Sequence, residues 1–242
     1  MALLYRNTDK DWQQIGELHP FWGVLTAPEF RNEALTPQNV ESFYASGVEH
    51  VNWLAEIVER HFGQPLKAMK ALDFGCGVGR LTHAMTALAE SVTGLDISPG
   101  MLAKARERTA AKVHFLNALT DEQFDWLHSF IVFQHIPPAR GMVILEDLLR
   151  RLTPGGLVTL HFTTGRSAFH RGKTVLARLR QWFTKRLKPT DRISMFDYDL
   201  GRLTNMFYTS GIRQMTFLPT DHGGHLGVFV IGRRDLEGSA NG

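Results

Sequence analysis

The segment ALDFGCGVGR, residues 71–80, places three glycines and the only cysteine of the chain within ten residues. Three kinds of chemistry fit such a segment: a loop that binds dinucleotide phosphates, a reactive cysteine, or a loop for another ligand. Gly75, Gly77 and Gly79 follow the pattern G-x-G-x-G, which is one residue shorter than the dinucleotide pattern G-x-G-x-x-G. No lysine follows the loop, so the sequence also departs from the phosphate-binding pattern G-x-x-x-x-G-K-S/T.

Two carboxylates near this loop favour a ligand other than a dinucleotide. Asp73 comes just before the turn, where its charge would repel a pyrophosphate and attract an amine or another cation. Asp96 lies nineteen residues beyond Gly77, at the end of a second expected strand, where a carboxylate can accept hydrogen bonds from both ribose hydroxyls. The loop therefore suits a nucleoside that carries a cationic amino-acid arm.

Cys76 is interpreted as a small packing residue of the loop. A redox or nucleophilic cysteine needs a resolving cysteine or a base beside it, and the chain has no second cysteine. A single cysteine also excludes an intramolecular disulfide framework and fits a reducing compartment.

The elements that must position these residues alternate between strands and helices. Strands are expected within residues 66–75, 91–98, 112–118, 124–136 and 156–164, separated by helical patterns. This alternation predicts a doubly wound parallel sheet. Residues 198–211 predict one more helix, and residues 212–220 and 225–234 are expected to form an antiparallel pair. Residues 8–62 predict helices, with breaks at LTPQN and at Ser46-Gly47.

The length of 242 residues and the apolar fraction of 43% fit one globular domain. We expect a helical lid over residues 1–64, a cofactor-binding core over 65–163, a basic cap over 164–196, and a helix with a hairpin over 197–236. The start of the chain lacks the pattern of a signal peptide, and no apolar run reaches the length of a membrane span. A cytoplasmic location is therefore expected.

Four segments in a fixed order resemble the class I S-adenosylmethionine (SAM) dependent methyltransferases. They are LDFGCGVGRLT (72–82), VTGLDISPGML (92–102), FDWLHSFIVFQHIPP (124–138) and LLRRLTPGGLVTLHF (148–162). The resemblance covers about residues 66–163. It implies a Rossmann-like, doubly wound sheet of seven strands with the last strand antiparallel. It also implies SAM as the cofactor and S-adenosylhomocysteine (SAH) as the product.

The resemblance assigns parts of the cofactor to particular residues. The methionine end would contact Asp73 and the loop glycines, the ribose would contact Asp96, and Ile97 and Met101 would flank the adenine. An acidic residue after the third strand contacts the adenine in many relatives. Here Asn117, the backbone of Ala118 and Asp121 are alternatives for that contact. The remaining candidates for the cofactor site are Ser46, Arg80, Phe130 and Gln134.

The acceptor side is predicted from polar residues at strand ends, beside the cofactor. His135 is the candidate base, with Gln134 beside it, and the alternative is a local structural hydrogen bond. His222, the second catalytic candidate, and His225 are next to two glycines and could line the substrate mouth or only form a hairpin turn. Nothing in the spacing of these three histidines supports a metal site.

Residues 164–192 contain nine lysines or arginines and one aspartate. Their apolar residues follow one helical stripe, so this cap could pack on the core, attract an anionic substrate, or contact a membrane through residues 172–188. A nucleic-acid partner is the least favoured reading. The expected enzyme methylates an oxygen or nitrogen of a small or medium-sized acceptor, which could be anionic, glycan-linked or lipid-linked. The alternatives are a nucleic-acid or protein methyltransferase and a SAM-binding protein without turnover.

Overall fold

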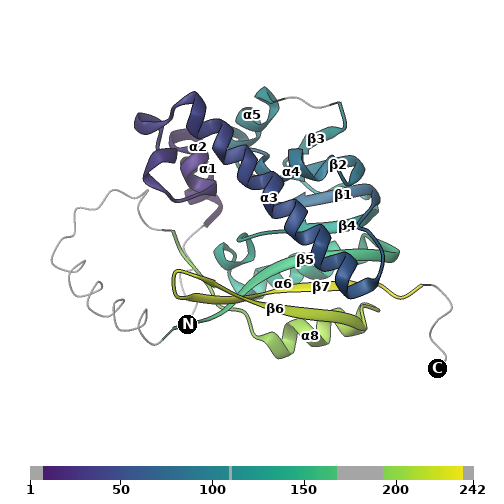
Figure 1. Ribbon diagram of the computed structural model, residues 1–242. Helices are drawn as coiled ribbons and strands as arrows, with labels where there is room; N and C mark the ends of the chain where they lie inside the picture. Colours follow the sequence, from purple (N-terminus) through teal and green to yellow (C-terminus); the bar gives the residue numbers. More distant parts are fainter. Residues whose placement is uncertain (1–7, 109–110, 168–192, 237–242) are drawn as a thin grey trace.

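The computed structural model describes residues 8–108, 111–167 and 193–236. Within them, seven strands form one sheet in the order β3-β2-β1-β4-β5-β7-β6 (Figure 1). The parallel part contains β1 (Ala68–Phe74), β2 (Ala89–Leu95), β3 (Val113–Leu116), β4 (Phe124–Ser129) and β5 (Leu152–Arg166). Strand β7 (His225–Arg233) is antiparallel to both β5 and β6 (Gln214–His222). The predicted sheet and its antiparallel end are confirmed.

Helices lie on both sides of this sheet, and the long helix α3 crosses its front face in Figure 1. The α-helices are α1 (Thr8–Leu18), α2 (Pro20–Val24), α3 (Pro37–Phe62), α4 (Arg80–Met85), α5 (Pro99–Glu107), α6 (Pro138–Arg150) and α8 (Leu200–Thr209). Short 3-10 helices are η1 (Pro28–Phe30), η2 (Asn32–Ala34) and η3 (Phe133–His135).

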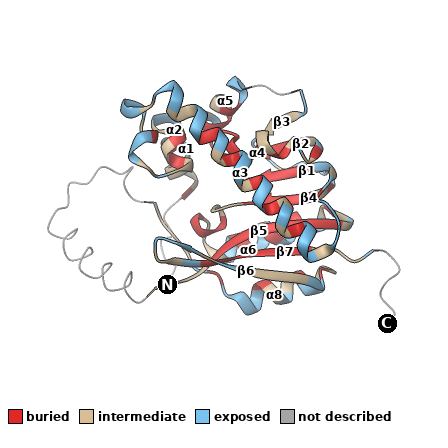
Figure 2. Cartoon of the chain, viewed as in Figure 1, coloured by how far each residue is buried: buried red, intermediate tan, exposed pale blue. Residues whose placement is uncertain are grey.

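Alternate residues of the central strands supply the two sides of the core, because side chains along a strand point to opposite faces. Leu72 and Leu127 pack in one cluster with residues of α6 and α8. Their sequence neighbours Ala71 and Trp126 pack in the other cluster with residues of α3 and α4. The strands are therefore buried on both faces, as the red ribbons of Figure 2 show.

Helices α1 and α2 join the start of α3 over the glycine loop and α5. Phe21 and Phe43 are buried there with Val78 of the loop and Met101 of α5. The N-terminal helices thus close over the end of the sheet at which the glycine loop lies.

The expected break of the helix at Ser46-Gly47 is wrong, because α3 runs without interruption from Pro37 to Phe62. Its ends are well defined: Thr36 accepts a hydrogen bond from the amide of Asn39, and Gly63 ends the helix with φ +69°. Gly47 has a packing role instead. A Cβ at this position would overlap the carbonyl oxygen of Arg80, so the missing side chain lets α3 approach α4.

The helical pattern between the strands expected at 66–75 and 91–98 continues through Glu90. Helix α4 is shorter than this pattern predicts, because it ends at Met85. The carbonyl of Leu88 accepts a hydrogen bond from the amide of Ala68, and β2 begins at Ala89 beside it. Sheet pairing therefore takes over residues that could continue the helix.

Residues 168–192 lie outside the described residues, and with them most of the basic cap and the proposed membrane contact at 172–188. Among the described helices, none is long and apolar enough to cross a membrane. The division into lid, core, cap and hairpin stays a prediction.

Candidate functional site

The glycine loop forms a tight connection between the carboxyl end of β1 and α4. Gly75, Gly77 and Gly79 have φ values of 76°, 54° and 81°, a region that other residues rarely adopt. The amides of Gly75 and Cys76 both donate to the carbonyl of Leu95, at 2.7 and 3.0 Å. These bonds anchor the loop to the end of β2, where Asp96 follows.

The Asp96 carboxylate is held in a single orientation by two backbone amides. Gly77 donates to Oδ2 at 2.9 Å, and Ser98 donates to Oδ1 at 2.8 Å. Burial raises the pKa of Asp96, and the amides of Ser98, Gly77 and Ile97 act against this rise. Each carboxylate oxygen has a second lone pair, so this group can still accept hydrogen bonds from two vicinal hydroxyls.

Asp73 and Arg80 are two buried ionisable groups next to the loop. Asp73 is 2% exposed and accepts a hydrogen bond from Thr82 at 2.7 Å. Burial raises its pKa to about 6, although the Thr82 bond and the charge of Arg80 oppose this. Nη1 of Arg80 donates to Ser46 of α3 at 3.2 Å, whereas Nε has no partner among the described residues. A buried guanidinium with a free donor suits a carboxylate ligand.

Cys76 is 4% exposed, and burial raises the pKa of its thiol. A protonated, buried thiol is a poor nucleophile. Its surroundings fit the packing role expected from the sequence.

The candidates for the adenine contact differ in exposure. Ile97 is 38% exposed, and Asn117 and Ala118 are exposed after β3. Met101 is 2% exposed, because it packs in the cluster that α1 and α2 form. Asp121 is fully exposed and lies 3.7 Å from Arg151. Ile97, Asn117 and Ala118 thus keep accessible surface, whereas Met101 is already covered by protein.

His135 belongs to a chain of buried hydrogen bonds. Its Nδ1 lies 2.9 Å from the carbonyl oxygen of Ser194, so Nδ1 carries the proton. Its Nε2 lies 3.1 Å from Nε2 of Gln134, which can only donate. Thr163 donates to the other end of the Gln134 amide at 2.7 Å, consistent with this orientation. Burial lowers the pKa of His135 to about 4, so the ring is neutral.

This chain of bonds occupies the lone pair that His135 would use as a base. The same region is bonded to residues 193–198, because the amide of Phe196 donates to the carbonyl of Gln134 at 2.7 Å. The role of His135 as the base stays a prediction, and the geometry describes a positioning role.

A second group of polar residues lies on the α3 side of the sheet, and the sequence reasoning did not identify it. Thr159, His161 and Thr163 of β5 are at most 1% exposed and alternate with Leu160 and Phe162. A strand buried on both faces is normally apolar on both. The alternation in VTLHFTT was therefore an available signal for a buried polar face.

His161 meets His222 at this polar face. The two rings lie 5.1 Å apart, and Nε2 of His161 lies 2.9 Å from Oγ1 of Thr220. His222 and His225 are paired in register at the ends of β6 and β7, where Asp221 accepts a hydrogen bond from the amide of Gly224. Among the described residues, no three His, Cys, Asp or Glu side chains are arranged to hold a metal ion.

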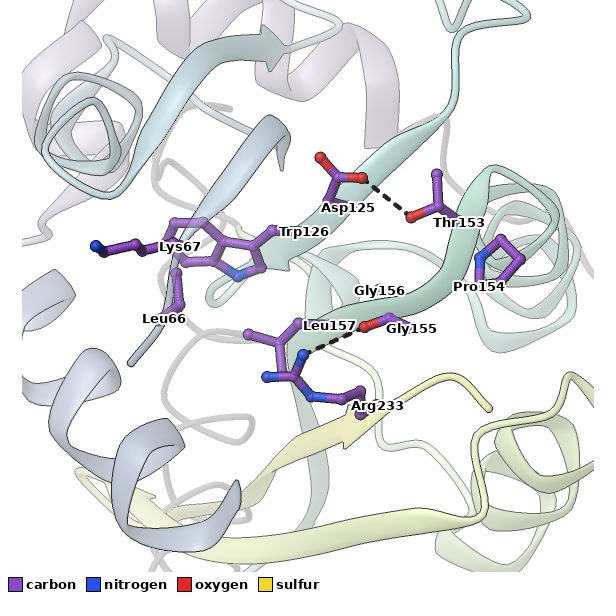
Figure 3. Close-up of a pocket in the computed structure, with 10 residues that line it drawn as sticks. All are labelled: Leu66, Lys67, Asp125, Trp126, Thr153, Pro154, Gly155, Gly156, Leu157 and Arg233. Carbon is purple, nitrogen blue, oxygen red and sulfur yellow. Dashed lines mark hydrogen bonds between the residues drawn. The ribbon is translucent and has the colours of Figure 1, made fainter. Parts of the chain in front are cut away.

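A small pocket lies at the other end of the strands, away from the glycine loop (Figure 3). Its walls come from the segment before β1, the first residues of β4 and β5, and the end of β7: Leu66, Lys67, Asp125, Trp126, Thr153, Pro154, Gly155, Gly156, Leu157 and Arg233. Ligands of open α/β sheets bind at the carboxyl ends of the strands. The pocket lies at the amino ends of β4 and β5, so we assign it no part in the site.

Residues 71–156 match the family described as "Methyltransferase domain". The ubiquinone biosynthesis O-methyltransferase of Dinoroseobacter shibae is 31% identical over 104 residues, which are 39% of this chain and 41% of that protein. A malonyl-(acyl-carrier protein) O-methyltransferase of Serratia marcescens is 30% identical over 142 residues, 52% of this chain and 53% of that protein. The aligned region thus spans about half the length of these curated relatives, or less.

A magnesium protoporphyrin IX methyltransferase from Synechocystis PCC 6803, solved with bound SAM, shares the fold. The two chains are 14% identical with a TM-score of 0.62, over 97% of this chain and 100% of that chain. The family match and this fold together confirm the resemblance to class I SAM-dependent methyltransferases.

Proposed function

We propose that this chain is a SAM-dependent methyltransferase that transfers a methyl group to an oxygen of a small or medium-sized acceptor. The observation that carries the proposal is the arrangement of Asp96, which two backbone amides hold at the end of β2 while the left-handed glycine loop lies beside it. The residues match the chemistry of SAM, which joins a ribose to a charged amino-acid arm.

Each part of the cofactor has a suitable group in this chain. Asp96 would accept hydrogen bonds from the ribose hydroxyls. The free Nε donor of Arg80 suits the carboxylate of the arm, and Asp73 suits its ammonium group. Three glycines without side chains allow the backbone to approach the ligand closely.

Bound SAM would supply a methyl group on a positively charged sulfur, and transfer to the acceptor leaves SAH. The protein then has to align the acceptor oxygen, exclude water, and take up the proton that the hydroxyl loses. Helices α1 and α2 cover the glycine loop and serve the exclusion of water. An oxygen acceptor is supported by the two curated relatives, both of which are named O-methyltransferases.

Calorimetric titration of the full chain with SAM, SAH and NAD⁺ tests the cofactor. We expect SAM and SAH to bind and NAD⁺ to give no saturable heat. Binding of NAD⁺ without binding of SAM would overturn the proposal. Incubation with methyl-labelled SAM and fractionated cell extract, followed by mass analysis of the labelled product, then identifies the acceptor. Binding without any methyl transfer would support a SAM-binding protein that lacks turnover.

A further inference from the structure

Histidine and aromatic rings gather at the carboxyl ends of β4 and β5, beneath α3. We call this group the histidine cluster: His50, His128, Phe130, His161, His222 and Phe229. Phe130 stacks on His50 at 4.4 Å and on Phe229 at 5.3 Å between ring centroids. The edges of Phe130 meet His161 and His222 at 5.4 and 5.5 Å. Residues from α3, β5, β6 and β7 thus converge on the ring of Phe130, which directly follows β4.

Three nitrogens of this cluster are buried and have no hydrogen-bond partner among the described residues. They are Nε2 of His50, Nε2 of His128 and Nδ1 of His161. The other nitrogens of the two fully buried rings are oriented by threonines, His128 by Thr159 at 2.8 Å and His161 by Thr220 at 2.9 Å. An unpartnered buried polar atom is costly and calls for an occupant such as a water or a ligand group.

The fold makes specific room for His161. A Cβ at Gly227 of β7 would lie 2.9 Å from Nε2 of His161 and 3.0 Å from Oγ1 of Thr220. Any larger residue at position 227 would therefore press on the bond that orients this ring. Glycine at this position keeps the free Nδ1 in place.

The histidine cluster adjoins the proposed cofactor site. His128 is in register with Asp73 on the neighbouring strand β1. The charge of Arg80 also acts on both His50 and His128 and helps to lower their pKa values. At the other side, His222 is exposed and Trp53 is 38% exposed, so the cluster reaches the molecular surface there. It thus lies between the molecular surface and the proposed cofactor site.

We propose that the histidine cluster recognises the acceptor, and that the acceptor presents a neutral hydroxyl on an apolar body. A hydroxyl both donates and accepts a hydrogen bond, so it satisfies either tautomer of His161 and its neighbours. A carboxylate can only accept and an ammonium can only donate. The half-buried ring of Phe130 and the 38% exposed ring of Trp53 supply an apolar surface for the rest of the molecule. This inference rests on the proposed methyl transfer to oxygen and names the class of acceptor.

The charges around the cluster agree with a neutral acceptor. Burial lowers the pKa of His222 at the exposed side of the cluster, and the charge of Asp221 opposes this. Burial and the charge of Arg80 lower the pKa of His50, and Asp73 in turn favours the charged form of Arg80. Burial keeps His161 and His50 neutral, with pKa values of about 3. A charged acceptor would lose its hydration among these neutral rings without gaining a counter-charge of its own.

Histidine nitrogen NMR of the full, SAH-loaded chain tests this proposal with phenol as the neutral probe. Benzoate and benzylammonium serve as charged probes with the same aromatic ring and a similar size. We expect phenol to shift the His161 ring signals in a saturable manner, and both charged probes to bind at least about tenfold more weakly. Substitution His161→Phe should raise the dissociation constant of phenol about tenfold or more.

Two further variants separate recognition from folding. Thr220→Val keeps the His161 ring and removes its orienting partner. It should therefore change the tautomer signals of His161 and weaken the binding of phenol. His114→Gln alters an exposed histidine on β3 and should leave phenol binding unchanged. Equal binding of benzoate, or phenol binding that His161→Phe and Thr220→Val do not affect, would overturn the proposal. Failure of SAH to bind the unaltered chain would instead contradict the proposed function.

Discussion

The side-chain amide of Gln134 donates a hydrogen bond to Nε2 of His135 over 3.1 Å, and it thereby occupies the lone pair that a catalytic base would need. The bond is one step in a chain from Thr163 through Gln134 and His135 to the carbonyl of Ser194. Because the side chains of Thr163, Gln134 and His135 are buried and partnered, the chain joins β5, η3 and the segment at residues 193–198 into one unit.

This chain of bonds predicts that Gln134→Leu and His135→Asn have similar effects. Each should lower the free energy of unfolding by about 1–3 kcal/mol, because partners such as Thr163 lose a buried hydrogen bond. Urea denaturation measures the loss, with the exposed Gln123→Leu as the control. If His135 is the base, His135→Asn will abolish methyl transfer while Gln134→Leu will not. That divergence in activity would contradict a purely positioning role.

Asp96 should be the residue on which cofactor affinity depends most directly. Asp96→Asn replaces one carboxylate oxygen by a donor, so it removes an acceptor from Gly77 or Ser98 and from the ribose. We expect the dissociation constant of SAM to rise by about 10- to 100-fold, which corresponds to about 1.4–2.8 kcal/mol. Titration calorimetry checks this, with Glu90→Gln at the exposed start of the same strand as the control. Unchanged affinity would show that the ribose binds elsewhere.

Gly47→Ala tests the close approach of α3 and α4, because helix propensity and packing predict changes of opposite sign in the free energy of unfolding. Helix propensity alone predicts that alanine stabilises the helix by about 1 kcal/mol. The overlap of the new Cβ with the carbonyl of Arg80 predicts net destabilisation by about 1–3 kcal/mol. It also predicts weaker SAM binding, because Arg80 would be displaced. At Gly165 of β5 a Cβ would meet nothing within 4 Å, so Gly165→Ala is the control for adding a methyl group without an overlap. A stabilised Gly47→Ala would contradict the packing argument.

Acid should destabilise this chain through its buried histidines. The pKa values of His50 and His161 are lowered to about 3 and that of His135 to about 4, from 6.5. Below pH 6.5 the unfolded chain binds protons that the folded chain does not, so stability is lost as the pH falls. Each such histidine contributes a slope of up to about 1.4 kcal/mol per pH unit. Asp73, whose pKa is raised to about 6, opposes part of this slope.

Denaturant titrations between pH 5 and pH 7 measure that slope. His161→Gln should reduce it by about one proton. An unaltered slope in His161→Gln would mean that His161 takes up its proton without disturbing the fold.

Much of the fold and of the cofactor side followed from the sequence because local rules govern both. Strand–helix alternation determines a doubly wound sheet, and Ser98 followed by Pro99 determines where α5 begins. The three closely spaced glycines require left-handed backbone, which the structure confirms. Asp73 and Asp96 lie at the same end of the sheet, because the parallel strands β1 and β2 have their carboxyl ends on the same side.

Residues far apart in the sequence could meet only through tertiary structure. The break expected at Gly47 is absent because a glycine in a helix can serve close packing, and the carbonyl of Arg80 that it accommodates is 33 positions away in sequence. The partners of His135 are its neighbour Gln134 and Ser194, which lies 59 positions away near the end of the cap. His50, His128, His161 and His222 lie on four different elements, and their spacing carries no periodic signal. The sequence by itself predicted the residues of the proposed donor side, because closely spaced glycines and strand-end carboxylates follow local rules, whereas only the folding of β4 to β7 against α3 brought together the residues of the proposed acceptor side.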